Sequence, residues 1–248
     1  MDSKNFMSLQ KHLEEFRNRL IFSVIFFLIA FCACYFFAAE IYNFLLQPFS
    51  DFSSDHQNRR LIYTSPAEAF TTYLKLSFYS SLFFSFPVFA SQFYFFLAPG
   101  LYKNEKKNIL MILFSSSFLF LFGALLAYYL ILPLAIEFFA SFEIKGSVTS
   151  LPIQLEARIS EYLNLVLNLL FGFGVAFQLP IFLLFLIRVG LLSVNDLKNK
   201  RRYWIVAIFI AAAVLTPPDI LSQISLAIPM ILLFEFVILI GKNFTNKK

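Results

Sequence analysis

A short polar segment between two long apolar stretches carries a carboxylate in unusual surroundings. Glu105 is flanked by Lys103 on one side and by Lys106 and Lys107 on the other, and residues 93–102 before it are mostly aromatic or apolar. Nearby positive charge favours the ionised form of a carboxyl group. We therefore expect an anionic spot with an apolar wall at a membrane surface.

Glu15 is a second carboxylate at the mouth of an apolar stretch. Arg19 follows it at i+4, a spacing that stabilises a helix without any ligand. Glu15 and Glu105 nevertheless share a face that is otherwise strongly basic. Basic residues repel generic cations, whereas two placed carboxylates hold guanidinium groups through bidentate hydrogen bonds. Two interpretations of Glu15 stay open at this point: a helix-stabilising ion pair, and one half of a site for an arginine-bearing ligand.

Gln178 and Glu235 are polar side chains that lie inside apolar stretches. Secondary transporters place such groups at mid-membrane to bind a solute, so a polytopic transporter of a small solute that uses both residues is an alternative function. The sequence shows no internal repeat of the kind from which many transporters build a solute pathway. Glu235 also lies near the end of its stretch, where a carboxylate pairs or reaches the membrane surface. A further interpretation is that the two residues form a polar face for a partner helix or an inserted peptide.

Catalytic chemistry finds little support in the sequence. The two histidines, His12 and His56, fall on opposite sides of the predicted membrane. The sequence contains no His-Glu-x-x-His, Gly-x-Ser-x-Gly or Gly-x-x-x-x-Gly-Lys motif, which are signatures of zinc, serine and nucleotide chemistry. Cys32 and Cys34 lie within one apolar stretch as packing groups. We expect no enzyme activity, no metal site and no cofactor.

The composition predicts a membrane protein. Of the 248 residues 59% are hydrophobic and only 14% are charged, whereas soluble domains carry about 25% charged residues. The net charge of +5 does not indicate nucleic-acid binding, because the aromatic residues lie inside apolar runs rather than among lysines and arginines.

Uncharged runs predict six membrane-spanning helices, because helices satisfy their own backbone polar groups in lipid. The first four runs are long enough to cross about 30 Å of hydrocarbon. The last two hold sixteen and fifteen uncharged residues and are separated by Thr-Pro-Pro-Asp at 216–219, which ends a helix. They predict a shortened hairpin. The predicted spans, in a single domain over residues 1–248, are about 20–39, 76–98, 109–136, 162–187, 203–218 and 220–240.

The distribution of basic residues predicts the orientation. Fifteen lysines and arginines lie in the two termini and in the connections after the second and fourth spans, and five lie in the other connections. An excess of basic residues marks the cytoplasmic side, so we expect both termini in the cytoplasm. On the far side, residues 40–75 and 137–161 mix aromatic residues, prolines and charges and predict an ordered cap. Residues 41–48 are expected to lie in the membrane interface as an amphipathic stretch.

Six sequence stretches in this order resemble the TatC family, the core membrane subunit of the twin-arginine protein translocase. They are His12-Leu13-x-Glu15-x-Arg17-x-Arg19; Pro48; Pro66-x-Glu68-x-Phe70; Phe96-x-Ala98-Pro99-Gly100-Leu101-Tyr102-x-x-Glu105; Phe177-Gln178-x-Pro180; and Leu215-Thr216-Pro217-Pro218-Asp219 followed by Ser222-Gln223, Ala227, Pro229 and Glu235. The resemblance extends over nearly the whole chain.

The resemblance implies an all-α membrane protein whose six transmembrane helices form a glove-like bundle with shortened fifth and sixth helices. It implies a receptor in the cytoplasmic (inner) membrane that binds the twin-arginine signal peptides of folded precursor proteins and exports these proteins with the proton-motive force. The implied partners are single-span proteins of the TatA and TatB types, further copies of the chain and the lipid bilayer, without nucleic acid.

The same resemblance implies roles for individual residues. Glu15 and Glu105 would hold the guanidinium groups of the signal, Phe96 and Leu101 would form the apolar wall, and Arg17 would belong to the same site. Many family members carry Glu at position 178, so hydrogen bonding rather than protonation is implied for the Gln found here. The positions implied in structure or partner contact are Pro48, Glu68, Gln178, Pro217, Pro218, Asp219, Gln223 and Glu235.

Overall fold

The chain is helical over almost all the residues that its computed structural model describes, which are 9–54, 61–97, 109–143, 155–216 and 219–245. The elements are α1 (Leu9–Phe36), α2 (Ala38–Ser54), α3 (Pro66–Leu97), α4 (Ile109–Leu126), the π-helix η3 (Ala127–Ile131), α5 (Leu132–Ala140), α6 (Ile159–Ala176), α7 (Leu179–Val189), α8 (Val194–Asn199), α9 (Arg201–Leu215) and α10 (Ile220–Thr245). The prediction of an all-α fold is confirmed.

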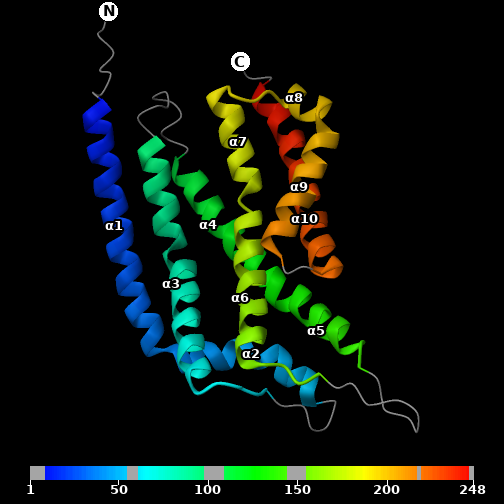
Figure 1. Ribbon diagram of the computed structural model, residues 1–248. Coiled ribbons are helices and arrows are strands. Elements are labelled where there is room, and N and C mark those ends of the chain that lie inside the picture. The colour runs from blue at the N-terminus through cyan, green and yellow to red at the C-terminus, as the bar shows by residue number, and fades with distance from the viewer. Residues whose placement is uncertain (1–8, 55–60, 98–108, 144–154, 217–218, 246–248) are drawn as a thin grey trace, which may run out of the picture.

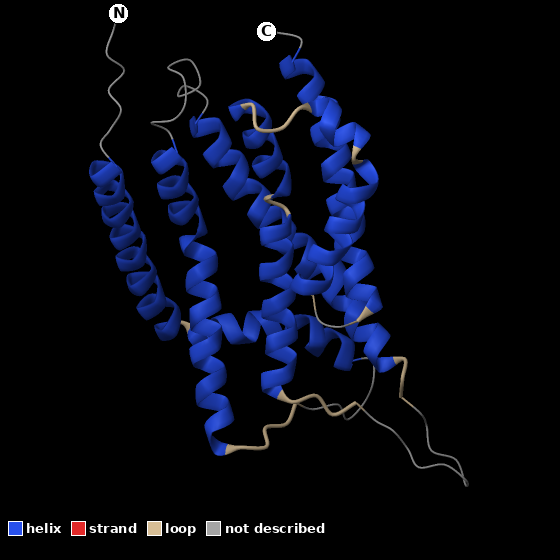
Figure 2. Ribbon diagram, turned by 45° about the horizontal axis from the view of Figure 1, so that its top comes forward, coloured by secondary structure: helices blue, strands red, loops and turns tan. Residues whose placement is uncertain are grey.

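The long helices stand side by side and are crossed at one end by α2 (Figures 1 and 2). The start of α1 and the end of α10 lie at the opposite end of the bundle, which we call the termini end; the other is the α2 end. Four stretches in the described part of the chain are long and apolar enough to cross a membrane: Leu13–Phe36, Leu113–Ala140, Ile159–Ile187 and Ile220–Gly241. The 32-residue α3, in which serines alternate with aromatic residues, and the 15-residue α9 complete the bundle.

Two of the predicted spans contain irregular turns, each beside a proline. In the stretch predicted as 162–187, the chain breaks between α6 and α7, and the amide of Gln178 donates to the carbonyl of Val175, three residues back, at 2.9 Å. Pro180 has no amide hydrogen for the carbonyl of residue 176, so a regular α-helix cannot continue here. In the stretch predicted as 109–136, Pro133 follows the π-turn of η3, and the amide of Leu132 donates to Ala127.

The predicted shortened hairpin holds for α9, which has 15 residues. By contrast α10 is helical for 26 residues and extends past the predicted end at 240 to Thr245. Only its uncharged part before Glu235 is short. The helix bounds do not fix where the bilayer begins and ends, so the span limits stay predictions.

The α2 end forms the expected cap in its described part. α2 buries one face, including Leu45 and Phe49, against the bundle, as an amphipathic stretch should. The connections before α3 and α6 meet there: the amide of Ile62 donates to the carbonyl of Ala157 at 3.1 Å, and the amide of Ile159 donates back to Ile62 at 3.0 Å. Two segments far apart in the sequence thus close one end of the bundle.

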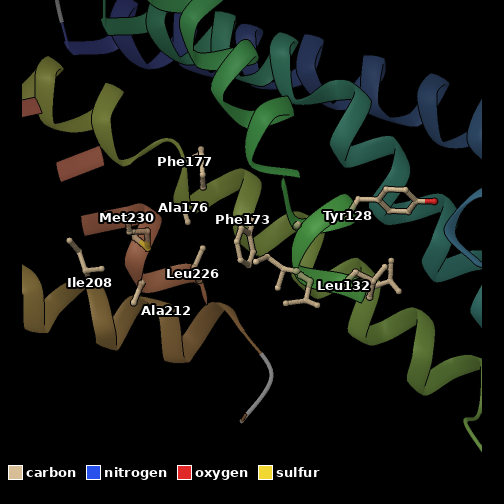
Figure 3. Close-up of a cluster of buried hydrophobic side chains, with 14 of the residues drawn as sticks. Tyr128, Leu132, Phe173, Ala176, Phe177, Ile208, Ala212, Leu226 and Met230 are labelled. Carbon is tan, nitrogen blue, oxygen red and sulfur yellow. The ribbon is translucent and has the colours of Figure 1, made fainter. Parts of the chain in front are cut away.

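The core is centred on α6. Phe173 is fully buried, and Figure 3 shows it between the α9–α10 pair, represented by Ala212 and Leu226, and the region of η3, represented by Tyr128. Close helix approach requires Gly172, because a Cβ there would lie 2.7 Å from the carbonyl oxygen of Leu215 at the end of α9. Helix α1 lies outside this core and packs mainly against α3 (Figure 1).

Candidate functional site

The candidate site lies between the first turns of α1 and the last turns of α3, at the termini end (Figure 1). Glu15, Arg19 and Ser23 are spaced by four residues and therefore share one face of α1. Ser23 is buried, and its hydroxyl donates to the carbonyl oxygen of Arg19 at 3.0 Å. This face is the one that α1 turns toward α3.

Glu15 and Arg19 form an ion pair on this face. Nε of Arg19 donates to Oε1 of Glu15 at 3.1 Å, and Nη2 of Arg19 donates to the same oxygen. The second carboxylate oxygen, Oε2, is buried and accepts no hydrogen bond from the residues that the structure describes. The pair expected from the spacing is present, and it leaves one acceptor of Glu15 unused.

Aromatic rings form a wall beside the ion pair. The ring centres of Phe16 on α1 and Phe96 on α3 are 5.2 Å apart. The guanidinium carbon of Arg19 lies 5.8 Å from the ring centre of Phe95, a distance at which a cation is attracted to an aromatic face. A cavity of about 170 Å³ opens between the two helices, lined by Phe16, Arg19, Leu20, Ser23, Phe89, Gln92, Phe93 and Phe96.

The structure brings some of the predicted site residues together and not others. Phe96 meets α1 through Phe16, the neighbour of Glu15. Arg17 is exposed. It lies two residues from Glu15, about 200° around the helix axis, and therefore points away from the face that meets α3. Leu101 and Glu105 lie outside the described residues, so their part in the site stays a prediction.

Arg19 and Phe16 were not predicted as members of the site. Arg19 was considered only as a helix-stabilising partner of Glu15, and the i+4 spacing was the signal that could have placed it in the site. Phe95, by contrast, falls in the aromatic stretch 93–102 that was expected to form the apolar wall. Together these groups offer the buried oxygen of a partly exposed carboxylate, aromatic faces and a small apolar cavity. Such a surface suits a ligand that carries a cationic group next to an apolar side chain.

Gln178 is held by a residue from another helix. Its Nε2 donates to the carbonyl oxygen of Ser116 on α4 at 3.0 Å, and the hydroxyl of Ser116 donates to Oε1 of Gln178 at 2.6 Å. The amide thus spans the break between α6 and α7 and ties it to α4. The implied hydrogen-bonding role of Gln178 has a partner inside the chain.

Glu235 and Gln178, the two residues of the transporter alternative, have separate partners. Oε2 of Glu235 accepts a hydrogen bond from Nη2 of Arg201 at 2.8 Å, which joins α10 to the start of α9. This agrees with the interpretation of Glu235 as a paired carboxylate near the end of its span. Among the described residues, no hydrogen bond or ion pair joins Glu235 to Gln178 in a common pathway.

Glu68 joins the two segments of the cap. Its Oε1 accepts a hydrogen bond from the hydroxyl of Ser160 at 2.6 Å, and its Oε2 accepts one from the amide of Thr64 at 2.8 Å. These hydrogen bonds, that of the Ser160 hydroxyl above all, lower the pKa of Glu68 from 4.5 to about 2. The carboxylate is therefore ionised over the whole physiological range.

Asp219 and Gln223, between and on the last two helices, form hydrogen bonds with backbone groups. Oδ1 of Asp219 accepts from the amide of Ser222 at 2.7 Å, which caps the start of α10. Nε2 of Gln223 donates to the carbonyl oxygen of Phe209 on α9 at 3.3 Å. Pro217 and Pro218 lie outside the described residues.

Comparisons with known proteins agree over most of the chain. The family model described as "Sec-independent protein translocase protein (TatC)" matches residues 11–229. A TatC protein of Rickettsia prowazekii is 48% identical over 233 residues, which are 94% of this chain and 92% of that protein. A TatC protein of Magnetococcus marinus is 41% identical over 248 residues, which are 100% of this chain and 89% of that protein.

A solved structure shows the same fold. The crystal structure described as the twin arginine translocase receptor TatC in DDM superposes with a TM-score of 0.79 at 35% identity and covers 93% of this chain and 99% of that one. These comparisons give no support to the solute-transporter alternative. They agree with the six-helix fold that the sequence predicted. The chain is thus a multi-pass membrane protein that belongs to the TatC family, the Sec-independent protein translocase subunits.

Proposed function

We propose that this chain is the receptor subunit that binds twin-arginine signal peptides at the cytoplasmic face of the inner membrane. With single-span partners of the TatA and TatB types, and with further copies of itself, it exports folded precursor proteins by means of the proton-motive force. The observation that carries the proposal is the buried, unused Oε2 of Glu15 beside the aromatic wall of Phe16 and Phe96. The excess of basic residues at the termini end supports a cytoplasmic position for this site.

The chemistry of the site predicts a moderate affinity for the signal peptide. A hydrogen bond to a charged group contributes about 1.5–3 kcal/mol when it is partly desolvated, whereas an exposed ion pair contributes about 0–1 kcal/mol. Glu15 is partly shielded, with its side chain 22% exposed. Recognition therefore rests on a few directional bonds together with contact to the aromatic wall, and added salt weakens the first encounter.

Glu105 supplies the second carboxylate of the proposal. Replacing Glu105 by Ala removes the acceptor and abolishes export, whereas Glu105→Asp keeps a carboxylate on a shorter side chain and only weakens export. The measurement is the fraction of a folded reporter that reaches the periplasm, at equal amounts of membrane-inserted protein. Wild-type export by Glu105→Ala would remove Glu105 from the site.

A crosslink tests the receptor function directly. A photoreactive phenylalanine in place of Phe96 preserves the ring at the wall, and the membranes are prepared without a proton gradient so that only binding is measured. Precursors carry either Arg-Arg or Lys-Lys in the signal. Crosslinking that requires Arg-Arg supports the proposal; equal crosslinking of both precursors contradicts it.

A second part of the proposal concerns partner contact. Gln178, Gln223 and Glu235 offer polar groups to a partner helix or to the inserted signal, in addition to their contacts within the chain. The test is Glu235→Leu, followed by crosslinking to the single-span partners and by the export assay. If both stay at the wild-type level, Glu235 serves only its ion pair with Arg201.

A further inference from the structure

We propose that Arg19 makes the Glu15 site selective for arginine over lysine. The inference rests on the proposed function, because it concerns how the same site distinguishes its ligands. In this proposal Arg19 acts through Glu15, because it occupies one of the two carboxylate oxygens of Glu15.

The contacts of Arg19 hold its guanidinium group in one place. Nε and Nη2 both donate to Oε1 of Glu15, and the guanidinium lies over the ring of Phe95. The side chains of Arg19 and Glu15 are only 27% and 22% exposed. The pair is therefore a partly buried unit on the α3-facing side of α1, unlike the exposed pair of Arg158 and Glu161 at the α2 end.

The pairing changes what Glu15 presents to a ligand. Arg19 neutralises most of the negative charge of Glu15, so an approaching cation is attracted only weakly by net charge. What remains is Oε2, a buried acceptor that receives no hydrogen bond within the described part of the chain. A buried acceptor without a partner is costly, so a donor that reaches it with the right geometry contributes more than an exposed contact would.

A guanidinium and an ammonium group meet these conditions differently. A guanidinium is planar, weakly hydrated and stacks on aromatic faces, so it can enter beside Phe16 and Phe96 and donate to Oε2. An ammonium is a compact, strongly hydrated charge that depends on net attraction to offset its dehydration. With the charge of Glu15 already neutralised, lysine loses its main source of binding, whereas arginine retains the directional bond and the aromatic contact.

The test compares Arg19→Gln with Arg19→Lys in the crosslinking assay from position 96, with Arg-Arg and Lys-Lys precursors and without a proton gradient. Arg19→Gln restores the net charge of Glu15, so crosslinking of the Lys-Lys precursor should rise. The ratio of Arg-Arg to Lys-Lys crosslinking should fall by about fivefold, the change that corresponds to about 1 kcal/mol. Arg19→Lys keeps a positive charge beside Glu15 and should stay close to the wild-type ratio.

The control is Arg158→Gln, which removes an arginine from the exposed ion pair at the α2 end and should leave the ratio unchanged. If Arg19→Gln lowers crosslinking of both precursors in proportion, Arg19 only stabilises α1, and the inference fails while the proposed function stands. An unchanged ratio in Arg19→Gln likewise overturns the inference alone. If the wild-type protein shows no preference for Arg-Arg, the proposed function fails, and this inference fails with it.

Discussion

Glu68 shows how one side chain holds two distant segments together. Its two oxygens accept hydrogen bonds from Thr64, just before α3, and from Ser160, at the start of α6. The carboxylate also lies in the first turn of α3, where a negative charge is favoured by the helix dipole. The ionised form of Glu68 is thus part of what keeps the cap closed.

This contact predicts a pH dependence of stability. The pKa of Glu68 is lowered to about 2 in the folded protein from an ordinary 4.5, so its contribution is complete above the ordinary value and is lost as the pH falls toward the folded value. We expect the advantage of the wild-type protein over Glu68→Gln in melting temperature to shrink between about pH 5 and about pH 2. Glu161→Gln, which changes an exposed carboxylate near the same cap, is the control. A constant advantage would show that the charge of Glu68 is unimportant.

Gln178 and Ser116 predict a coupled effect on stability. The two residues exchange two hydrogen bonds, at 2.6 and 3.0 Å, and such bonds between membrane helices contribute about 0.6–2 kcal/mol. Gln178→Leu removes both bonds, whereas Ser116→Ala keeps the one to the carbonyl oxygen. In unfolding of the purified protein in detergent, the double variant should be less destabilised than the sum of the single variants by about 1 kcal/mol. Additive losses would mean that the two side chains do not interact.

At the scale of helices, α2 is fixed to the bundle by hydroxyl groups that bind its backbone. Pro48 lies inside α2 and has no amide hydrogen, so the carbonyl of Phe44, four residues earlier, lacks its helical donor. The hydroxyl of Tyr128, in η3, donates to that carbonyl at 2.6 Å, and the ring of Tyr128 stacks on Phe44 with centres 4.8 Å apart. The hydroxyl of Tyr162 donates to the next carbonyl, that of Leu45, at 3.0 Å.

The Pro48–Tyr128 arrangement predicts that Pro48→Ala reduces the loss of stability caused by Tyr128→Phe. Tyr128→Phe removes the hydroxyl that donates to the carbonyl of Phe44 and should destabilise the protein by about 1–3 kcal/mol. Pro48→Ala returns the backbone amide, so the double variant should lose less stability than Tyr128→Phe alone. Melting temperatures in detergent are the measurement, and Tyr162→Phe is the matched control because Leu45 keeps a helical donor at Phe49. If Pro48→Ala does not reduce the effect of Tyr128→Phe, the hydroxyl is not compensating for the proline.

At the scale of the whole molecule, the arrangement separates two ends with different tasks. The termini end carries the site between α1 and α3, and the α2 end is closed by the cap (Figure 1). Because α1 packs mainly on α3 and little of it is buried, most of its apolar surface faces the bilayer or a partner. The α6-centred core is therefore a scaffold from which the site stands apart.

The orientation of the two ends is the corresponding prediction. Single cysteines at Ser193, before α8, and at Thr64, before α3, are introduced after replacement of Cys32 and Cys34. A membrane-impermeant thiol reagent should label position 64 in intact cells and position 193 only after the membrane is opened, because basic residues gather on the cytoplasmic side. Labelling of position 193 in intact cells would reverse the proposed orientation.

The sequence alone determined the helical class, the short α9 and the interruption between α9 and α10. These follow from the lengths of uncharged runs and from proline positions, which are local properties that hold wherever a chain meets lipid. The ordered motifs also predicted the family correctly. The ion pair of Glu15 and Arg19 could also be predicted from the sequence, because its partners are one helical turn apart.

Only the tertiary structure decided the contacts between helices. Three hydrogen bonds join residues that are far apart in the sequence. Gln178 and Ser116 are 62 residues apart, Tyr128 and Phe44 are 84 apart, and Glu68 and Ser160 are 92 apart. The unused Oε2 of Glu15 and the position of Arg19 over Phe95 likewise depend on how α1 is turned against α3. Hydropathy and charge patterns fix that a helix forms, but its rotation and its partners follow from the packing of side chains between helices, which no local pattern contains.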